Sequence, residues 1–137
     1  MRQPPTVPPT EKASKSLLLV EDDPALRESL FEHFETRGWH LTAVGTADEA
    51  IGLVGRGVLY DVVLTDITMP GRLDGIDLAR SILQERPTAR VIVMSGYTAR
   101  AAELKEVVSK GARFLPKPFR LRGLDAVIEG LLDTGSS

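Results

Sequence analysis

Residues 61–70 read Asp61-Val62-Val63-Leu64-Thr65-Asp66-Ile67-Thr68-Met69-Pro70, and this stretch decides the fold. Residues 62–64 predict a short buried strand that places Asp66 just past its C-terminal end. Pro70 and Gly71 then stop the strand and turn the chain. In an open α/β sheet the reactive crevice lies beyond the carboxyl ends of the strands, so Asp66 is positioned for chemistry. A single aspartate there is more often a turn residue or a helix cap, so other strand ends must supply matching groups.

Four more short apolar segments predict strands, at residues 17–20, 39–44, 91–94 and 113–115. Helical patterns follow the five strands at residues 24–37, 46–54, 75–85, 99–110 and 121–132. This alternation predicts a parallel sheet with right-handed crossovers. Pro116 donates no ladder hydrogen bond, which favours an edge position for the fifth strand. The predicted fold is therefore α/β, a flavodoxin-like (βα)5 three-layer sandwich with strand order 2-1-3-4-5.

The composition indicates one globular domain. The 137 residues are 42% hydrophobic and 26% charged, with a net charge of -2 and no cysteine. Disulfides, thiolate metal sites and a cysteine nucleophile are thus excluded, and no basic excess points to nucleic acid. No apolar run is long enough for a membrane helix and no signal peptide is visible, so we expect a cytoplasmic location. We expect residues 1–16 to be a disordered Pro-rich tail or linker, 17–132 the domain and 133–137 a polar tail.

The predicted strand order brings five polar groups to one crevice: Glu21, Asp22, Asp66, Ser95 and Lys117. Three carboxylates at close range raise one another's pKa unless a cation lies among them. Mg²⁺ prefers oxygen ligands and is typically held by one or two carboxylates plus a phosphate. A lysine and a serine hydroxyl are suited to bind phosphoryl oxygens. Asp66 is then available as a nucleophile that forms an aspartyl phosphate.

Simpler interpretations exist for several of these residues. The acids at residues 21–23 also suit a helix N-terminus, where the helix dipole favours negative charge. Ser95-Gly96 is common turn chemistry, and Phe114 is equally a core or edge aromatic. His33 and His40 share no metal-ligand spacing. The charges of Arg100, Glu103, Lys105 and Glu106 are most simply a solvated helix face, and a partner surface is the alternative.

The chain resembles the receiver domain of two-component response regulators. Five blocks carry the resemblance: residues 18–24 (Leu-Leu-Val-Glu-Asp-Asp-Pro), 63–70 (Val-Leu-Thr-Asp-Ile-Thr-Met-Pro), 74–75 (Asp-Gly), 93–96 (Val-Met-Ser-Gly) and 117–119 (Lys-Pro-Phe). Each block alone is weakly specific, but the five in this order are highly specific. The resemblance covers about residues 17–132 and fits either a single-domain regulator or the receiver of a hybrid histidine kinase.

The resemblance implies a role for each group of the crevice. Asp66 is expected to be the phosphorylated residue. Asp22 and Asp66 are expected to bind Mg²⁺ directly with the backbone carbonyl of Thr68, while Glu21 acts through a bound water. Lys117 is expected to pair with the phosphoryl group.

The resemblance also implies a switch. Ser95 is expected to move toward the phosphoryl group, and the ring of Phe114 to turn inward as it does. Lys117-Pro118 is expected to be a cis peptide. Three features depart from the common pattern. The turn at residues 70–75 is one residue longer, Phe114 has no hydroxyl group, and Pro116 stiffens the approach to Lys117.

The expected function is that of a phosphoacceptor signalling domain that takes a phosphoryl group from a histidine kinase or a histidine phosphotransfer protein. It would catalyse only its own Mg²⁺-dependent phosphorylation and dephosphorylation, and act on a downstream protein or a fused kinase domain. One alternative is a Mg²⁺-dependent phosphatase with an aspartyl intermediate. Such enzymes usually carry a general-acid aspartate where this chain has Thr68. A second alternative is an adaptor that binds a partner without phosphorylation.

Overall fold

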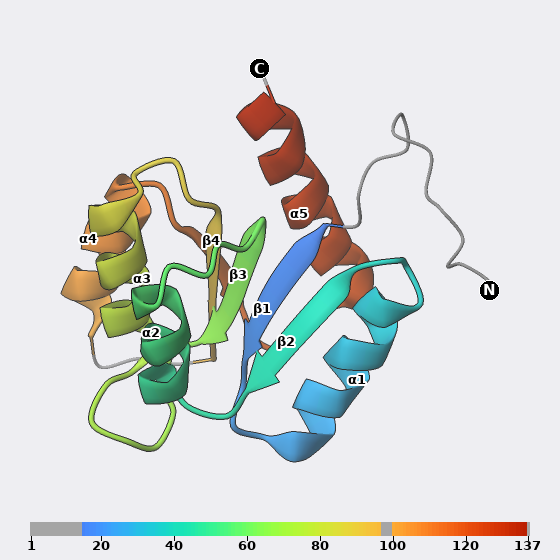
Figure 1. The fold of residues 1–137 in the computed structure, drawn as a ribbon, viewed down its shortest axis with the longest axis horizontal. Coiled ribbons are helices and arrows are strands. Elements are labelled where there is room, and N and C mark those ends of the chain that lie inside the picture. Colours follow the sequence, from blue (N-terminus) through green and yellow to red (C-terminus); the bar gives the residue numbers. More distant parts are fainter. Residues whose placement is uncertain (1–14, 97–99, 137) are drawn as a thin grey trace.

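The computed structural model describes residues 15–96 and 100–136, in which five strands alternate with five helices (Figure 1). Of the predicted N-terminal tail, residues 1–14 lie outside this description, as does Ala99 at the predicted start of the fourth helix. In chain order the elements are β1 (Ser16–Val20), α1 (Pro24–Glu35), β2 (His40–Val44), α2 (Ala47–Gly55), β3 (Val62–Asp66), α3 (Gly75–Glu85), β4 (Val91–Ser95), α4 (Ala101–Ser109), β5 (Arg113–Pro116) and α5 (Leu121–Ser136).

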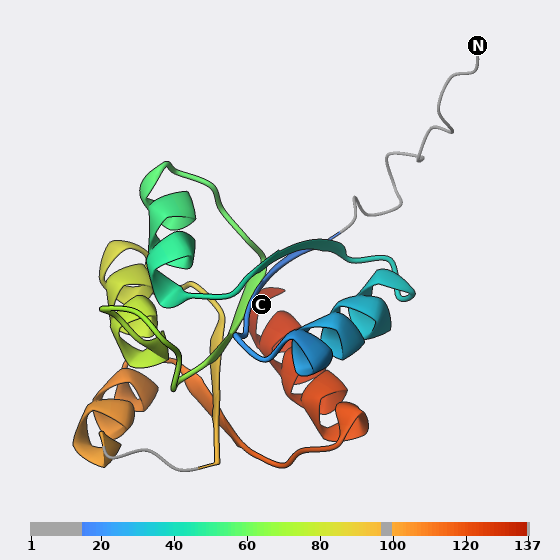
Figure 2. The same ribbon diagram turned by 90° about the horizontal axis from the view of Figure 1, so that it is seen from below.

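All four strand pairings are parallel, and the order is β2-β1-β3-β4-β5. The predicted topology is therefore confirmed, with β5 at an edge. Figure 2 shows three layers, with α2, α3 and α4 on one side of the sheet and α1 and α5 on the other. Neighbouring residues of β1 face opposite cores: Leu18 and Val20 pack in one, Leu17 and Leu19 in the other. A strand covered on both faces explains the unbroken apolar runs in the sequence.

Side-chain caps begin the first three helices. Asp23 accepts a hydrogen bond from the Ala25 N–H at 3.0 Å, and Pro24 occupies the first helical position. Thr46 caps α2 by accepting from the Glu49 N–H at 3.1 Å. The Glu49 carboxylate returns to the Gly45 N–H at 3.2 Å, one residue earlier than in a standard capping box.

Two predicted boundaries were wrong. Asp66 is the last residue of β3 rather than a residue beyond it, because the ladder continues through the Ile67 N–H, which donates to the Met94 carbonyl at 2.9 Å. Helix α5 runs to Ser136, so most of the predicted polar tail is helical. Polar residues do not stop a helix, and Gly135 costs it only about 1 kcal/mol.

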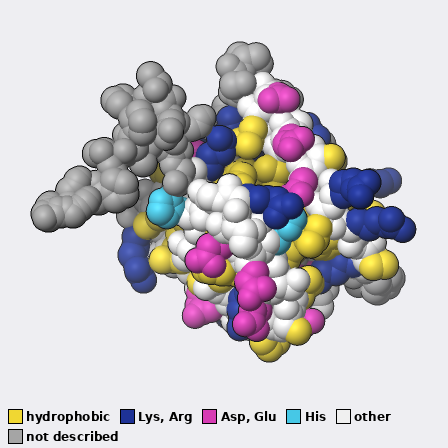
Figure 3. Space-filling view, turned by 90° about the vertical axis from the view of Figure 1, so that its right-hand side faces the viewer, with side chains coloured by type: hydrophobic (Ala, Val, Ile, Leu, Met, Phe, Trp, Pro, Cys, Tyr) yellow, Lys and Arg dark blue, Asp and Glu magenta, His cyan; other side chains and the backbone are white. Residues whose placement is uncertain are grey.

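The surface is mixed in charge. Acidic and basic side chains both occur, with hydrophobic ones between them, on the face shown in Figure 3. Among the helices of the described residues, none combines the length and the apolar character needed to cross a bilayer.

Candidate functional site

The three predicted acids meet at the carboxyl end of the sheet. Glu21 and Asp22 directly follow β1, Asp66 ends β3, and these two strands are neighbours. One carboxylate oxygen from each residue lies within 4.8 Å of the other two. Glu21 and Asp66 are buried, at 1% and 7% exposure, whereas Asp22 is exposed. The cluster is thus open to solvent on the Asp22 side.

Lys117 faces these acids from the connection after β5. Its Nζ donates a hydrogen bond to Glu21 Oε1 at 3.2 Å and lies 3.4 Å from Asp66 Oδ2. The side chain is 25% exposed, so its ammonium group is only partly removed from water. One cation therefore serves two buried carboxylates, with a third carboxylate beside them.

Burial is the main cause of the raised pKa values of Glu21 and Asp66. Burial raises the pKa of Glu21; a hydrogen bond from the Asp23 N–H opposes this, and the Asp66 charge adds to it. Burial also raises the pKa of Asp66, with Lys117 opposing the shift and Asp22 adding to it. Burial lowers the pKa of Lys117, but Asp66 and Glu21 raise it more, so its net shift is upward.

The donor set fits a hard divalent cation. It offers carboxylate oxygens, one of them on the solvent side, and Mg²⁺ favours oxygen ligands and retains waters. The two positive charges of such an ion would offset the repulsion between these carboxylates, two of which are buried. The residues present are therefore compatible with a Mg²⁺ ion.

The connection between β3 and α3 is closely packed against Asp66. A Cβ atom on Gly75 would overlap the Asp66 carbonyl oxygen and lie 2.9 Å from the Asp66 carbonyl carbon, so only glycine fits. Gly71 has φ +114°, a conformation that favours glycine. The Asp48 carboxylate accepts a hydrogen bond from the Leu73 N–H at 3.3 Å and ties the long turn to α2.

The predicted switch residues lie on the two strands beyond Asp66. Ser95 ends β4, is buried, and its carbonyl accepts a hydrogen bond from the Lys117 N–H at 2.9 Å. Phe114 in β5 is 41% exposed, so its ring is largely outside the core. Thr68 is exposed, two residues after Asp66. The Lys117-Pro118 peptide is cis, as expected.

The interpretation of the charges of the fourth helix as a solvated face is wrong for two of its residues, Arg100 and Glu106. Arg100 immediately precedes α4, and its Nη1 donates to both carboxylate oxygens of Asp74, at 2.8 and 2.9 Å. The same nitrogen lies 3.3 Å from Asp77 Oδ1. Glu106 pairs with Arg80 of α3 at 3.0 Å. These charges therefore join α4 to α3.

His33 is another residue to which the sequence assigned no role. Its Nε2 lies 2.9 Å from Asp125 Oδ1, and its ring meets Phe34 edge-on. The contact joins α1 to α5 and is structural. No spacing rule could reveal it, because 92 residues separate the two partners.

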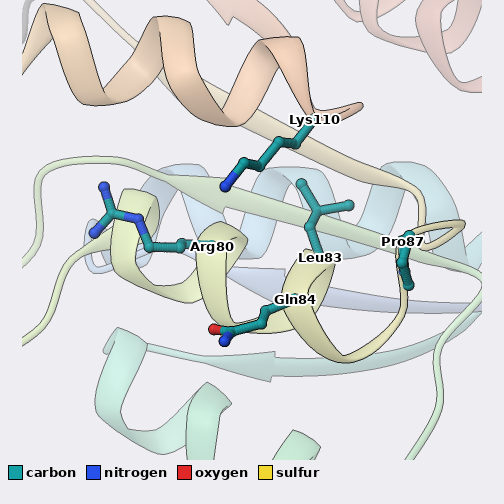
Figure 4. Close-up of a pocket in the computed structure, with 5 residues that line it drawn as sticks. All are labelled: Arg80, Leu83, Gln84, Pro87 and Lys110. Atoms are coloured by element: carbon teal, nitrogen blue, oxygen red, sulfur yellow. The ribbon is translucent and has the colours of Figure 1, made fainter.

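A hollow of about 440 Å³ lies between α3 and α4, away from the acids (Figure 4). Arg80, Leu83, Gln84 and Pro87 line one side, and Lys110 reaches in from the end of α4. Arg80 and Lys110 both form ion pairs with Glu106, at 3.0 Å and 3.3 Å. None of the five residues that line this hollow belongs to the acidic cluster.

Comparison with known proteins places this geometry in a family. The family model described as the response regulator receiver domain matches residues 17–129. The chain is 42% identical over 119 residues to the transcriptional activator protein PfeR of Pseudomonas aeruginosa, covering 87% of this chain but 38% of PfeR. It is 34% identical over 118 residues to the response regulator receiver protein CpdR of Brucella abortus, covering 86% of this chain and 97% of CpdR.

Solved structures of response regulators also match the fold of this chain. A CheY-like response regulator receiver domain protein from Methanospirillum hungatei matches with a TM-score of 0.81 and 26% identity, over 90% of this chain and 98% of that one. The response regulator protein TrrA of Thermotoga maritima, solved in complex with Mg²⁺-BeF, matches with a TM-score of 0.73 and 27% identity, over 85% and 98%. Phosphoryl acceptance is typical of this family. Because the family model covers residues 17–129, the chain belongs to the receiver domain family of two-component response regulators.

Proposed function

We propose that Asp66 is the phosphoacceptor of this receiver domain and that residues 17–132 form the functional unit. The observation that carries the proposal is the convergence of three carboxylates within 4.8 Å, two of them facing the Lys117 ammonium group. Among these acids Asp66 alone ends a strand in the middle of the sheet. Its backbone is held by Gly75 and by the ladder to β4, which fixes the direction of attack.

The proposed reaction is phosphoryl transfer between two side chains. An Asp66 carboxylate oxygen attacks the phosphorus of a phosphohistidine, the P–N bond breaks as the new P–O bond forms, and the departing imidazole nitrogen takes a proton from solvent water. Asp22, Asp66 and the Thr68 carbonyl would hold Mg²⁺, with Glu21 acting through water. The ion would supply positive charge to the phosphoryl oxygens. Lys117 would leave its carboxylate partners to bind a phosphoryl oxygen, and Ser95 would donate a hydrogen bond to another.

The proposed donor is a cytoplasmic histidine kinase or histidine phosphotransfer protein. A groove of about 670 Å³ lies beside Lys117 and offers apolar contacts from α1 (Leu26), the connection between β5 and α5 (Pro118 and Phe119) and the start of α5 (Leu121). Such a groove suits a helix that presents a phosphohistidine next to the acids. The relatives include the sensor kinase CckA of Brucella abortus, of which this chain covers 13%. Both a separate donor and a fused kinase are therefore consistent with the proposal.

The proposed output is a change in the populations of two arrangements of α4, β5 and α5. Phe114, now 41% exposed, would turn inward when Ser95 moves toward the phosphoryl group. Since Phe114 has no hydroxyl group, packing alone would stabilise the inward ring. The domain would catalyse its own phosphorylation and dephosphorylation and no other reaction.

Intact-mass measurement after incubation with acetyl phosphate and Mg²⁺ tests the proposal. Wild type should gain the mass of one phosphoryl group, and the gain should disappear with EDTA and in Asp66→Asn. Asp125→Asn is the matched control and should be phosphorylated normally, because Asp125 of α5 pairs with His33 of α1 and is not one of the clustered acids. An adduct in Asp66→Asn, or none in wild type, would contradict the proposal.

A further inference from the structure

The three acids of the site are not held equally. Glu21 accepts hydrogen bonds from the Asp23 N–H at 3.1 Å and from Lys117 at 3.2 Å, and Asp66 lies 3.4 Å from Lys117. Within the described residues, the exposed Asp22 carboxylate accepts no hydrogen bond. The direction of its side chain therefore depends on the backbone that carries it.

That backbone is held by a residue of α1. Arg27 Nη1 donates a hydrogen bond to the Glu21 carbonyl oxygen at 2.8 Å, and this carbonyl belongs to the peptide that joins Glu21 to Asp22. The Glu21 N–H donates in turn to the Val44 carbonyl at 3.1 Å. The guanidinium group also lies against Gly45 at the end of β2, where a Cβ atom would be 3.4 Å from Arg27 Nη1. Arg27 thus links α1, β2 and the end of β1 at the peptide preceding Asp22.

We propose that Arg27 is a positioning residue for the metal site: it fixes the Glu21–Asp22 peptide and so aims the Asp22 carboxylate at the shared cation. The inference rests on the proposed function, because it assumes that the acids bind Mg²⁺. The structural basis is that a charged donor restrains the peptide orientation of the one ligand that lacks a side-chain restraint.

A general charge effect and a positioning role predict opposite changes in Mg²⁺ affinity when Arg27 is replaced. The guanidinium is a positive charge near the acids, so removing it would by electrostatics alone strengthen Mg²⁺ binding. If Arg27 instead aims Asp22, its removal weakens binding, by about tenfold on the scale of residues that orient metal ligands. The sign of the change therefore separates a positioning role from a general charge effect.

The experiment is a MgCl₂ titration of the unphosphorylated protein followed by ¹H–¹⁵N NMR, which reports affinity and folding in the same spectra. Arg27→Met should raise the Kd for Mg²⁺ about tenfold, and Arg27→Lys, which retains a charged donor, should recover much of the affinity. Arg37→Met is the matched control, two residues past the end of α1 at Glu35. Arg37 is 52% exposed and donates to the His33 carbonyl, so its loss should leave the Kd unchanged.

The possible outcomes are distinct. Folded Arg27→Met that binds Mg²⁺ as tightly as wild type, or more tightly, would overturn the inference while leaving the proposed function intact. If Arg27→Met does not fold, Arg27→Gln takes its place, with weaker binding supporting a positioning role and unchanged or tighter binding refuting it. Wild type that shows no Mg²⁺-dependent shifts at residues 21, 22 and 66 would instead refute the proposed function, and the inference with it.

Discussion

Replacing Gly75 by alanine should damage both the stability and the chemistry of this domain. The added Cβ would overlap the Asp66 carbonyl oxygen and lie 2.9 Å from both the Asp66 carbonyl carbon and Ile67 Cα. Carbon atoms in ordinary contact are about 3.5–4.0 Å apart, so the start of α3 and the end of β3 must separate by roughly 1 Å. Neither backbone segment can rotate away as a side chain could. Overpacking of this kind costs about 1–3 kcal/mol, and we expect a value near 3 kcal/mol.

The helix itself argues for the opposite sign. Alanine is a better helix former than glycine by up to about 1 kcal/mol, so without the clash Gly75→Ala would stabilise the protein. Gly52→Ala is the matched control, because Gly52 lies within α2 with nothing within 4 Å of an added Cβ. Urea unfolding followed by circular dichroism should show Gly52→Ala stabilised and Gly75→Ala destabilised. Acetyl phosphate should label Gly75→Ala about 100-fold more slowly, since the acceptor is displaced by roughly 1 Å. A Gly75→Ala protein as stable as wild type would refute the packing argument.

Three further predictions concern charge. Burial raises the pKa of Asp66 above its unfolded value, so the folded state holds the extra proton and loses stability as pH rises through that interval. In metal-free protein, the stability advantage of Asp66→Asn in urea unfolding should therefore grow as the pH rises from about 4, the ordinary pKa of an aspartate, through the raised pKa of folded Asp66. A constant or shrinking advantage would contradict the assigned cause. Lys117→Met should lower the unfolding free energy of the metal-free protein by about 2 kcal/mol at neutral pH. This loss is smaller than for a fully buried ion pair because Lys117 is 25% exposed. An unchanged urea unfolding midpoint would show that the pairing contributes nothing. Arg100→Gln should cost about 1–2 kcal/mol of unfolding free energy, and Arg80→Gln, which removes a more exposed pair between the same helices, should cost less. Equal losses would remove the distinction.

The fold was predictable because its determinants are local. Asp23-Pro24 begins a helix through one cap and one fixed φ angle, and the apolar runs follow from strands covered on both faces. Pro116 indicated which strand lies at an edge. The end of α5 could not be placed, because residues 133–136 lack a signal strong enough either to extend or to stop a helix.

The acids and Lys117 were predictable from topology, because parallel strands deliver their C-terminal residues to one edge. The restraints around them were not. Arg27 reaches the Glu21 carbonyl, Arg100 reaches Asp74, and His33 reaches Asp125. Each is a side chain whose direction depends on tertiary packing, and no periodicity in the sequence encodes it. The length of the turn at residues 70–75 was visible, but its tie to Asp48 was not.

The most direct test of the claim that Asp66 is the phosphoacceptor is to identify which residue becomes phosphorylated. Borohydride reduces an aspartyl phosphate to homoserine, which tandem mass spectrometry locates in a peptide. After incubation with acetyl phosphate and Mg²⁺, homoserine should appear at position 66 and should be absent when EDTA replaces Mg²⁺. Homoserine at Asp22, Asp23 or Asp74 instead of position 66, or labelling that is indifferent to Mg²⁺, would contradict the account.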